Sequence, residues 1–297
     1  MKNNMKLFYN DDYVAAKYAY DTTRKAQYIH ESLMNDPIGN ISIYTPHLFT
    51  DRTKELISTV HDGDYVDAVR TGSPAQKAES QGFDWDDGIW DMAVAHSTGL
   101  VAATTEAISA ETRAGSLSSG LHHANRSGGS GFCTINGLAV AAKQAVEMDA
   151  PRVLILDFDA HAGGGTWDII SNHLPSVVQI DVTCSPFDTY EPTGESMLTL
   201  CGAHDYREKI KSALGYASIR STIDPFDIVI YNAGMDPLNS GVSLNDIFYR
   251  EKAVSDFIGD SPAIFALAGG YTWGNTTMDE LVSWHRITID TWANSNY

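Results

Sequence analysis

The sequence has little cysteine and no long hydrophobic run. Only three of its 297 residues are cysteines (Cys133, Cys184 and Cys201), too few for a disulfide framework, so a reducing, cytoplasmic setting is expected. Residues 1–8 have no apolar signal-peptide core behind them. The longest weakly charged segment, residues 92–110, still carries a histidine, a glutamate and several hydroxyl side chains. We therefore predict that it forms a buried helix and that the protein has no membrane partner.

Basic residues are also scarce. The chain has 20 Lys and Arg against 38 Asp and Glu, a formal net charge of -18. This balance argues against a nucleic-acid partner, because contacts to phosphates need a basic face. The acidity either keeps the protein soluble, reflects a salty habitat, or steers a cationic substrate toward the protein.

Four apolar segments that each end in polar residues or glycine indicate the fold class. The segments are 153–156, 177–180, 227–231 and 263–268, with helical patterns around 166–172, 204–219 and 245–257. Apolar runs of this length are typical of strands buried on both faces. Their alternation with helices predicts an α/β fold with a mainly parallel sheet covered on both faces. Since no repeat or boundary is evident, we expect residues 1–297 to form a single domain.

The N-terminal part is predicted to add short strands and several helices. We expect strands at 6–9 and 41–43 and helices at 13–33, 51–60, 62–69 and 89–111, with Thr50 or Asp51 as the cap of the second helix. The loop at 72–88 contains Phe83 and Trp85 among acidic residues. These aromatic side chains either form the rim of a pocket or simply anchor the loop.

Residues 113–131 have the Gly- and Ser-rich composition of a linker. However, the histidine pair His122-His123 lies in the middle of this segment. The segment also leads directly into residues 132–136 and then into an alanine-rich helix that ends at Met148. We therefore expect it to belong to a functional site.

The most informative motif follows the run at 153–156. Asp157, Asp159 and His161 are spaced by two, and glycines occupy positions 163–165. Side chains spaced by two lie on one side of an extended chain, and glycines allow the backbone to turn sharply. The motif would thus lie at the carboxyl edge of the sheet, where open α/β folds place their chemistry.

Other strand ends are expected to meet at the same edge. Asp236 and Tyr271, which follow the third and fourth runs, would then join Asp159 and His161. Two carboxylates and one imidazole suit a divalent metal with open positions, with Zn²⁺ as the default and Fe²⁺, Co²⁺ or Mn²⁺ as alternatives. Each residue alone is more often structural, as a cap, a turn or part of the core. Their combination is what indicates a metal site.

In this order, the motifs resemble those of the histone deacetylase superfamily, which includes lysine deacetylases and bacterial acetylpolyamine amidohydrolases. The matching blocks are residues 120–124, 131–136, 156–161, 232–236 and 267–271. The likeness is strong in these blocks and weak over the rest of residues 8–289. It implies the arginase-like α/β fold and a zinc-dependent hydrolase that acts on linear amides.

The resemblance also implies roles for individual residues. Asp159, His161 and Asp236 match the metal ligands of the family. His122 and His123 match its tandem histidines, which act as acid and base. In the implied mechanism, a metal-bound water attacks the amide after one of these histidines accepts its proton.

Further positions match the residues that surround this centre. Asp157 matches the carboxylate that hydrogen-bonds the first histidine, and Tyr271 matches the tyrosine that polarises the substrate carbonyl. Phe132 matches one wall of the substrate channel, to which we also assign Gly131 and Gly270. A monovalent cation site for K⁺ or Na⁺ is implied for Asp157, Asp159, His161 and Asp181.

The sequence departs from the family pattern in two places. Gly164 stands where relatives have the Asp or Asn that orients the second histidine. Either another group replaces that partner, or His123 contributes less to the reaction. In addition, the loop at 237–241 is short, so the mouth of the substrate channel is expected to differ.

Three functions remain open at this point. The first is deacylation of a small-molecule or peptide N-acyl amine such as acetyl-lysine or an acetylpolyamine, and the acidic balance favours a cationic substrate. The second is an arginase-type ureohydrolase with two manganese ions, which would need a carboxylate where Gly163 lies. The third is a non-catalytic, ligand-binding relative, which the departure at 162–164 would suit. The oligomeric state is left open.

Overall fold

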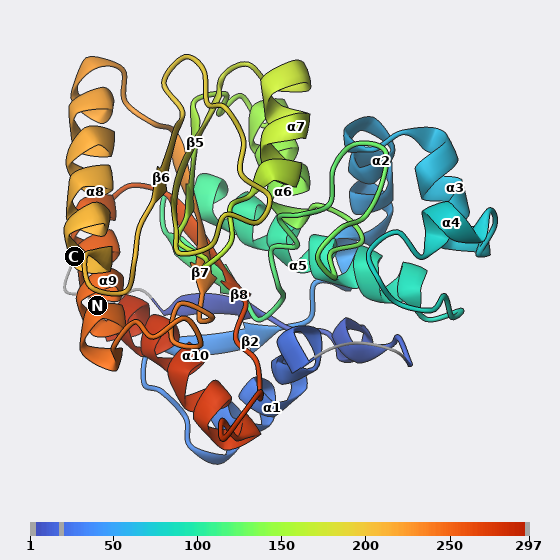
Figure 1. Cartoon of the computed structure of the whole chain (residues 1–297), viewed down its shortest axis with the longest axis horizontal. Helices are drawn as coiled ribbons and strands as arrows, with labels where there is room; N and C mark the ends of the chain where they lie inside the picture. Colours follow the sequence, from blue (N-terminus) through green and yellow to red (C-terminus); the bar gives the residue numbers. More distant parts are fainter. Residues whose placement is uncertain (1–3, 18–20, 295–297) are drawn as a thin grey trace.

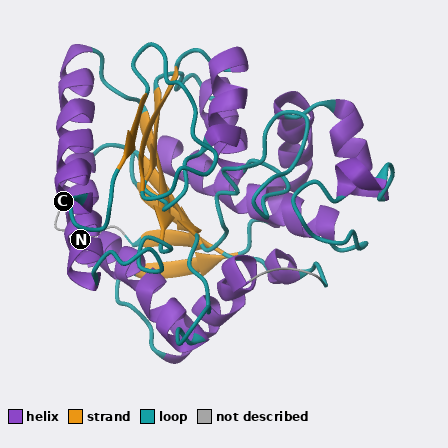
Figure 2. Ribbon diagram, in the orientation of Figure 1, coloured by secondary structure: helices purple, strands orange, loops and turns teal. Residues whose placement is uncertain are grey.

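An eight-stranded sheet forms the centre of the described chain. The computed structural model describes residues 4–17 and 21–294, and within them every strand pairing is parallel. The strand order is β2-β1-β3-β8-β7-β4-β5-β6 (Figure 2). The strands are β1 (Met5–Phe8), β2 (Ile41–Tyr44), β3 (Arg113–Ser116), β4 (Val153–Asp157), β5 (Val177–Thr183), β6 (Met197–Leu200), β7 (Ile228–Gly234) and β8 (Ala263–Ala268).

Helices cover both faces of this sheet, as Figure 1 shows. One face packs against α1 (Asp21–Asn35), α8 (Tyr206–Ile223), α9 (Leu244–Ile258) and α10 (Met278–Asn294). The other packs against α5 (Ile89–Ser109), α6 (Gly137–Glu147) and α7 (Gly164–His173). Outside α5 lie the shorter helices α2 (Thr50–Val60), α3 (Gly63–Thr71) and α4 (Ala75–Ala78), while two 3₁₀ turns, η1 (Asp11–Val14) and η2 (His47–Phe49), connect elements. This architecture confirms the predicted fold class.

Strand β4 shows why a continuous apolar run was needed. Leu154 and Leu156 belong to the hydrophobic cluster on one face of the sheet, and Val153 and Ile155 belong to the cluster on the other face. All four side chains are fully buried. Burial of each contributes roughly 1.5–3 kcal/mol, so both faces of the strand must be apolar.

Several predicted boundaries were wrong in the N-terminal part. The predicted helix at 13–33 is interrupted: Tyr13 lies in η1 and α1 begins at Asp21, while residues 18–20 fall outside the described part. The residue that caps α2 is Phe49, without a side-chain hydrogen bond, and Thr50 is the first residue of the helix, where its hydroxyl donates to the carbonyl oxygen of His47. The predicted loop at 72–88 contains the short helix α4.

Strands β3 and β6 and helix α10 were not predicted. Strand β3 lies in the Gly- and Ser-rich segment and carries almost no hydrophobic signal. A Cβ on Gly115 would lie 2.2 Å from the ring of Phe265 on neighbouring β8, so this position has no room for a larger residue. The small residues that resemble a linker thus allow β3 to pair inside the sheet.

Parallel pairing brings the polar strand ends together. In the register of the sheet, Asp157 is aligned with Asp181 on β5 and with Asn232 on β7. Asp159, His161 and Asp236 follow within a few residues of the ends of β4 and β7. The site therefore lies at the carboxyl edge of the sheet. In residues 4–17 and 21–294, no helix combines the length and the apolar character needed to cross a membrane.

Candidate active site

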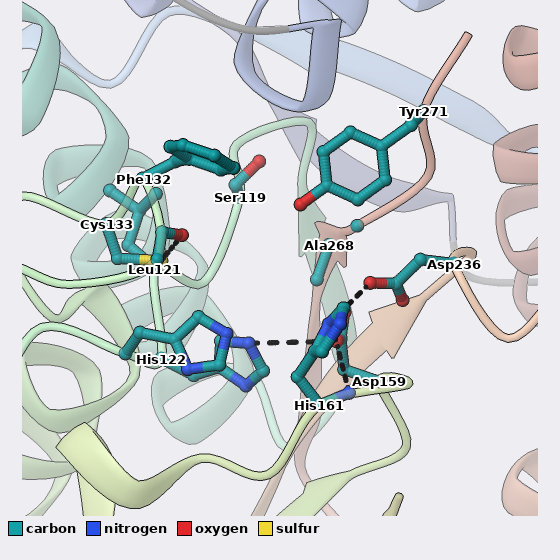
Figure 3. A pocket seen from close by; sticks show the side chains of 13 residues that line it. Ser119, Leu121, His122, Phe132, Cys133, Asp159, His161, Asp236, Ala268 and Tyr271 are labelled. Atoms are coloured by element: carbon teal, nitrogen blue, oxygen red, sulfur yellow. Dashed lines mark hydrogen bonds and ion pairs between the residues drawn. The ribbon is translucent and has the colours of Figure 1, made fainter. Parts of the chain in front are cut away.

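Asp159, His161 and Asp236 form one compact group at the carboxyl edge. Each offers a ligand atom, and these atoms all lie within 4.8 Å of one another. His161 Nδ1 lies 3.0 Å from Asp236 Oδ2 and 3.3 Å from Asp159 Oδ1 (Figure 3). Both carboxylates are buried, whereas the His161 side chain is 29% exposed and faces the cavity. Hard oxygen and borderline nitrogen donors in this number suit a divalent metal such as zinc.

Two observations test whether this group fits a cation. Asp159 Oδ2 is buried and has no hydrogen-bond partner, so it is free to act as a ligand. A Cβ on Gly269 would lie 2.5 Å from Asp236 Oδ1 and 2.7 Å from Asp159 Oδ2. Gly269, at φ +59°, thereby keeps the space beside the carboxylates open. The residues present fit a bound metal ion.

The electrostatics of the group also favour a positive charge. Burial and the neighbouring Asp159 carboxylate raise the pKa of Asp236 to about 6. Burial alone would lower the pKa of His161, but hydrogen bonds and charge from Asp159 and Asp236 outweigh burial and raise it to about 10. The buried carboxylates of Asp159 and Asp236 thus bind a proton when no other positive charge is near. A metal ion would neutralise the same negative charge.

His122 is held by a buried carboxylate. Its Nδ1 lies 2.7 Å from Asp157 Oδ2, and Asn232 Nδ2 donates to Asp157 Oδ1 at 2.9 Å. Burial acts to lower the pKa of His122, but the charges of Asp157 and Asp159 outweigh it and raise the pKa to about 10. The contact between Asp157 and His122 is the one that the sequence motifs led us to expect.

His123 has a carboxylate partner as well, which agrees with the first of the two alternatives left open by Gly164, that another group replaces the missing partner. His123 Nδ1 lies 2.7 Å from Asp188 Oδ2, on the loop between β5 and β6. Asp188 thus replaces the Asp or Asn that relatives have at the position of Gly164. Burial and the charge of His122 lower the pKa of His123 to about 4, and Asp188 only partly opposes them.

The two histidine rings face a narrow cavity together with the metal-ligand group. Their ring centroids lie 3.9 Å apart, and each residue is 5% exposed. The cavity has a volume of about 30 Å³. The predicted site residues that line it are His122, His123, Gly131, Phe132, Asp159, His161, Asp236 and Tyr271.

Phe132 lines this cavity, and other aromatic residues pack against its lining residues. Phe132 stacks on Phe83 at a centroid distance of 5.6 Å, so Phe83 both anchors its loop and supports the wall. Phe187, which is 47% exposed, packs edge-on against His123 at 4.9 Å. A Cβ on Gly131 would lie 2.4 Å from His123 Cδ2, so a glycine there lets the chain pass close to the ring.

Tyr271 approaches the cavity from the side opposite His122, as Figure 3 shows. Its main chain is held by one side chain, because Tyr271 N donates to Asn239 Oδ1 and Asn239 Nδ2 donates to the Tyr271 carbonyl oxygen. Gly269 lines the cavity, whereas the space at Gly270 faces Leu281 and His285. The structure therefore does not bring Gly270 into the substrate channel as expected.

A scan against family models matches residues 18–285 to the histone deacetylase domain. The chain belongs to this family. Among curated proteins, an uncharacterized protein from Picosynechococcus sp. is 30% identical over 219 residues, which span 71% of this chain and 70% of that protein. Acetoin utilization protein AcuC from Bacillus subtilis is 35% identical over 133 residues, which span 41% of this chain and only 34% of AcuC.

Solved structures confirm the fold of this family member. The HD domain of HDA15 superposes with a TM-score of 0.76 at 20% identity, covering 98% of this chain and 91% of that one. The acetylpolyamine aminohydrolase from Burkholderia pseudomallei also has a TM-score of 0.76, at 18% identity, and the match covers 98% of this chain and 99% of the aminohydrolase. Membership of the histone deacetylase family supports a hydrolase of the deacetylase type.

In this family member, Asp181 lies beside Asp157 in the register of β4 and β5. Asp181 Oδ2 accepts hydrogen bonds from Gly163 N at 2.8 Å and from Gln179 Nε2 at 3.0 Å. Its other oxygen, Oδ1, is buried without a hydrogen-bond partner. Burial and the charge of Asp157 raise the pKa of Asp181 well above its usual value. The K⁺ or Na⁺ site at this position stays a prediction.

Sequence reasoning missed three side chains that support the candidate site. Asp188 contacts His123, Asn239 holds the main chain of Tyr271, and Ser119 lines the cavity. Asn232 was seen only as part of a motif, although it donates to Asp157. The absence of a carboxylate or amide side chain at Gly164 was the one signal in the sequence that another residue could contact His123.

Proposed function

We propose that the chain is a metal-dependent amidohydrolase that removes a short acyl group, most simply acetyl, from a small N-acylated amine. The observation that carries this proposal is the convergence of three ligand atoms within 4.8 Å on a cavity that two histidines and Tyr271 also line. Family membership supports the same class of reaction.

Asp159, His161 and Asp236 would hold the metal, with zinc as the first choice and Fe²⁺, Co²⁺ or Mn²⁺ as alternatives. When bound, such an ion would polarise the amide carbonyl and make an attacking water more acidic. The chain's part is to supply two negative charges and one neutral nitrogen in a site largely shielded from solvent.

The histidine pair would move the protons. His122 and His123 lie side by side, and each has its Nδ1 against a carboxylate. A ring held in this way keeps its other nitrogen, Nε2, available to the cavity. Between them, the two rings would accept a proton from the attacking water and give one to the leaving amine.

Tyr271 would stabilise negative charge on the former carbonyl oxygen. Its ring lies across the cavity from His122, and Asp236 and His161 line the same cavity (Figure 3). A hydroxyl aimed at a developing oxyanion typically contributes about 100-fold or more in rate. Asn239 holds the tyrosine main chain at both its N–H and its carbonyl, which limits movement of the side chain.

The shape and charge of the site suggest the substrate. A cavity of about 30 Å³ favours a short acyl group, and Phe132 with Phe187 would flank the alkyl chain of the amine. Asp84 is exposed next to Phe83, which supports the Phe132 wall, and the whole chain has a net charge of -18. An amine that carries a second positive charge, such as an acetylated polyamine or acetyl-lysine, fits this setting. We expect the enzyme to work in the cytoplasm.

The arginase-type alternative receives no support from the site. Its second metal would need a carboxylate where Gly163 lies, and a Cβ there would meet Asp157 Oδ2 at 2.8 Å. Within the described ranges, the group Asp159, His161 and Asp236 is the single cluster with metal-ligand geometry. We therefore expect one equivalent of metal.

Activity assays combined with metal analysis test this proposal. Purified protein loaded with zinc would be assayed with acetylputrescine, an acetyl-lysine peptide and arginine. We expect amine release from at least one of the first two, loss of that activity with a chelator, and one equivalent of bound metal. Asp236→Ala should lose both the metal and the activity, because the site would keep only two ligands.

Asp260→Ala serves as the matched control, since Asp260 is an exposed aspartate outside the site. It should keep both the metal and the activity. Urea release from arginine with two equivalents of metal would favour a ureohydrolase. A metal-loaded protein that is silent on a broad panel of acyl amines would instead favour a non-catalytic relative.

A further inference from the structure

Asp188 reaches the second histidine from a distant part of the chain. Its Oδ2 lies 2.7 Å from His123 Nδ1, although the two residues are 65 positions apart. The same oxygen accepts a hydrogen bond from Gly165 N at 3.2 Å. The His123 side chain is 6% exposed and that of Asp188 is 24% exposed, so the contact is largely shielded from water. A shielded, doubly supported carboxylate is suited to orient a histidine ring.

Gly164 makes room for this contact. A Cβ on Gly164 would lie 2.4 Å from the Asp188 carbonyl oxygen and 2.4 Å from Asp188 Oδ1. The first of these atoms belongs to the main chain and cannot rotate away. Asp188 also has a left-handed φ of +59°, which aspartate tolerates better than most residues. An aspartate at position 164 and the observed position of Asp188 therefore exclude each other.

We propose that Asp188 is the positioning residue for His123, and that glycine is required at position 164 because it admits Asp188. This inference rests on the proposed amide hydrolysis. By accepting the Nδ1 proton, Asp188 would leave Nε2 as the acceptor nitrogen of a ring that lines the cavity. The orienting carboxylate has thus been moved to another loop and not lost.

Kinetics of the zinc-loaded enzyme with acetylputrescine or the acetyl-lysine peptide give the first test. Asp188→Ala should lower kcat by about 10- to 100-fold with little change in KM, as is usual when a carboxylate that orients a catalytic ring is removed. Asp188→Asn keeps an acceptor oxygen and should restore most of the rate. Glu191→Ala, an exposed carboxylate in the same loop, is the matched control and should behave like the parent enzyme.

Proton NMR of ¹⁵N-labelled protein gives a second test that does not depend on turnover. In the zinc-loaded protein, two Nδ1 protons that are hydrogen-bonded to carboxylates are expected, one from His122 with Asp157 and one from His123 with Asp188. Asp188→Ala should remove one resonance, and Asp157→Ala should remove the other. If both resonances and kcat persist in Asp188→Ala, the proposal is wrong. If the resonances behave as expected but no amide is hydrolysed, the proposed function fails and the contact stands.

A double-mutant cycle tests the role of Gly164. Gly164→Ala would displace Asp188. Gly164→Ala should therefore lower kcat no further once Asp188 has already been replaced by alanine. The double variant should therefore be no slower than the slower single variant. Losses that multiply would show that Gly164 acts independently, which would overturn this part of the proposal. Circular dichroism of each variant, with Asp188→Asn as the milder change, would separate an effect on kcat from a failure to fold.

A separate observation concerns Cys184 and Cys201, which follow the neighbouring parallel strands β5 and β6. Their sulfur atoms lie 3.7 Å apart, both residues are partly exposed, and both are free thiols. The segment between them carries Phe187 and Asp188. Cys184 N also donates at 2.9 Å to the carbonyl oxygen of Ala160, which lies between two of the metal-ligand residues. The pair therefore sits at the base of the loop that serves the site.

We infer that these two cysteines form a reversible disulfide when exposed to a peroxide. One thiol would lose its proton, and its sulfur would attack the peroxide O–O bond, giving a sulfenic acid; the hydroxide that leaves takes up that proton and departs as water. The second thiol would then attack that sulfur, forming the S–S bond as a second water leaves. The two sulfurs together lose two electrons, and the peroxide gains them. The bond would fix both ends of the loop that carries Asp188.

Mass spectrometry before and after hydrogen peroxide treatment tests this inference. The peptides that contain Cys184 and Cys201 should become linked, with the loss of two hydrogens, and dithiothreitol should separate them. Closing the loop should also raise the thermal unfolding midpoint, an effect that Cys201→Ser abolishes and Cys133→Ser, at the third cysteine, leaves in place. Oxidation of either sulfur to sulfinic acid without linkage, or no reaction, would refute it.

Discussion

The two halves of the site are built in different ways. The strand-end half, with Asp157, Asp159 and Asp236, follows strands whose main chains are paired on both sides. The loop half, with His123, Phe132, Asp188 and Tyr271, lies on irregular segments. In the strand-end half, sheet register decides where each side chain lies, whereas in the loop half individual side-chain contacts do.

Backbone conformation shows the same contrast. Leu121, Phe132 and Asp188 all have positive φ values, of +56°, +66° and +59°, and all three lie on the loops of the site. Residues other than glycine are rarely held in this region, and doing so costs of order 1 kcal/mol or more each. The surrounding contacts must supply that energy, so the loop half depends on its neighbours more than the strand-end half does.

The strand-end half is tied down by a fully buried arginine. Arg250 Nη1 donates to the carbonyl oxygens of Phe158 at 3.1 Å and Gly234 at 2.6 Å, next to the metal-ligand residues. Its charge is balanced by Glu251, with Nη2 and Oε1 2.6 Å apart, and both side chains have zero exposure. Arg250 thus links the end of β7 to the residue that follows β4, beside the site.

The largest expected effect therefore concerns stability. Arg250→Ala should lower the free energy of unfolding by about 3–5 kcal/mol, because it leaves the Glu251 carboxylate buried without its partner. Urea denaturation would measure the change. Arg207→Ala, which removes a surface ion pair with Asp246, is the matched control and should cost at most about 1 kcal/mol. Equal losses for the two variants would show that the strand-end half has no special anchor.

The next effect concerns catalysis in the loop half. Tyr271→Phe should lower kcat by about 100-fold, because it removes a hydrogen-bond donor to the oxyanion, while the bound metal remains at one equivalent. Steady-state assays and metal analysis would be run on the same preparation. Tyr28→Phe, at an exposed tyrosine on α1, provides the control and should leave kcat unchanged. Loss of metal in Tyr271→Phe would mean that the loop half contributes to metal binding in the strand-end half.

The smallest effect, about 1.4 kcal/mol per pH unit, is a pH dependence of stability that comes from His96 on α5, which contacts the segment leading to the histidine pair. His96 is fully buried and accepts a hydrogen bond from Ser119 N, and burial lowers its pKa to about 4. The folded state therefore favours the neutral ring. Above pH 6.5 the ring is neutral in both states and has no effect. As pH falls from 6.5 toward 4, the unfolded chain takes up a proton first, so stability falls by about 1.4 kcal/mol per pH unit.

Comparing variants isolates this contribution. In metal-free protein, His96→Gln should reduce the dependence of unfolding free energy on pH between 4 and 6.5 by about 1.4 kcal/mol per unit. His204→Gln is the control, because the His204 side chain is 88% exposed to solvent and its substitution should leave the slope unchanged. An unchanged slope in His96→Gln would mean that the ring is not held neutral by burial.

The predicted part of the site follows from short-range patterns. Asp157, Asp159 and His161 could be assigned to one edge because the two-residue repeat of a strand and the apolar run before it are both local properties. Boundaries were less secure where the signal was weak. Tyr13 was placed in a helix that begins only at Asp21, and β3 was missed because its small residues resemble a loop.

By itself, the sequence determined the alternation of strands and helices, the order of the motifs and the residue types that can hold a metal. These depend on neighbours a few positions apart. Only the tertiary structure decided that Asp188 meets His123 and that Asn239 holds Tyr271, 65 and 32 positions away in the chain. Such pairs lie on loops without a periodic pattern, so their meeting depends on how the whole sheet and its connections pack.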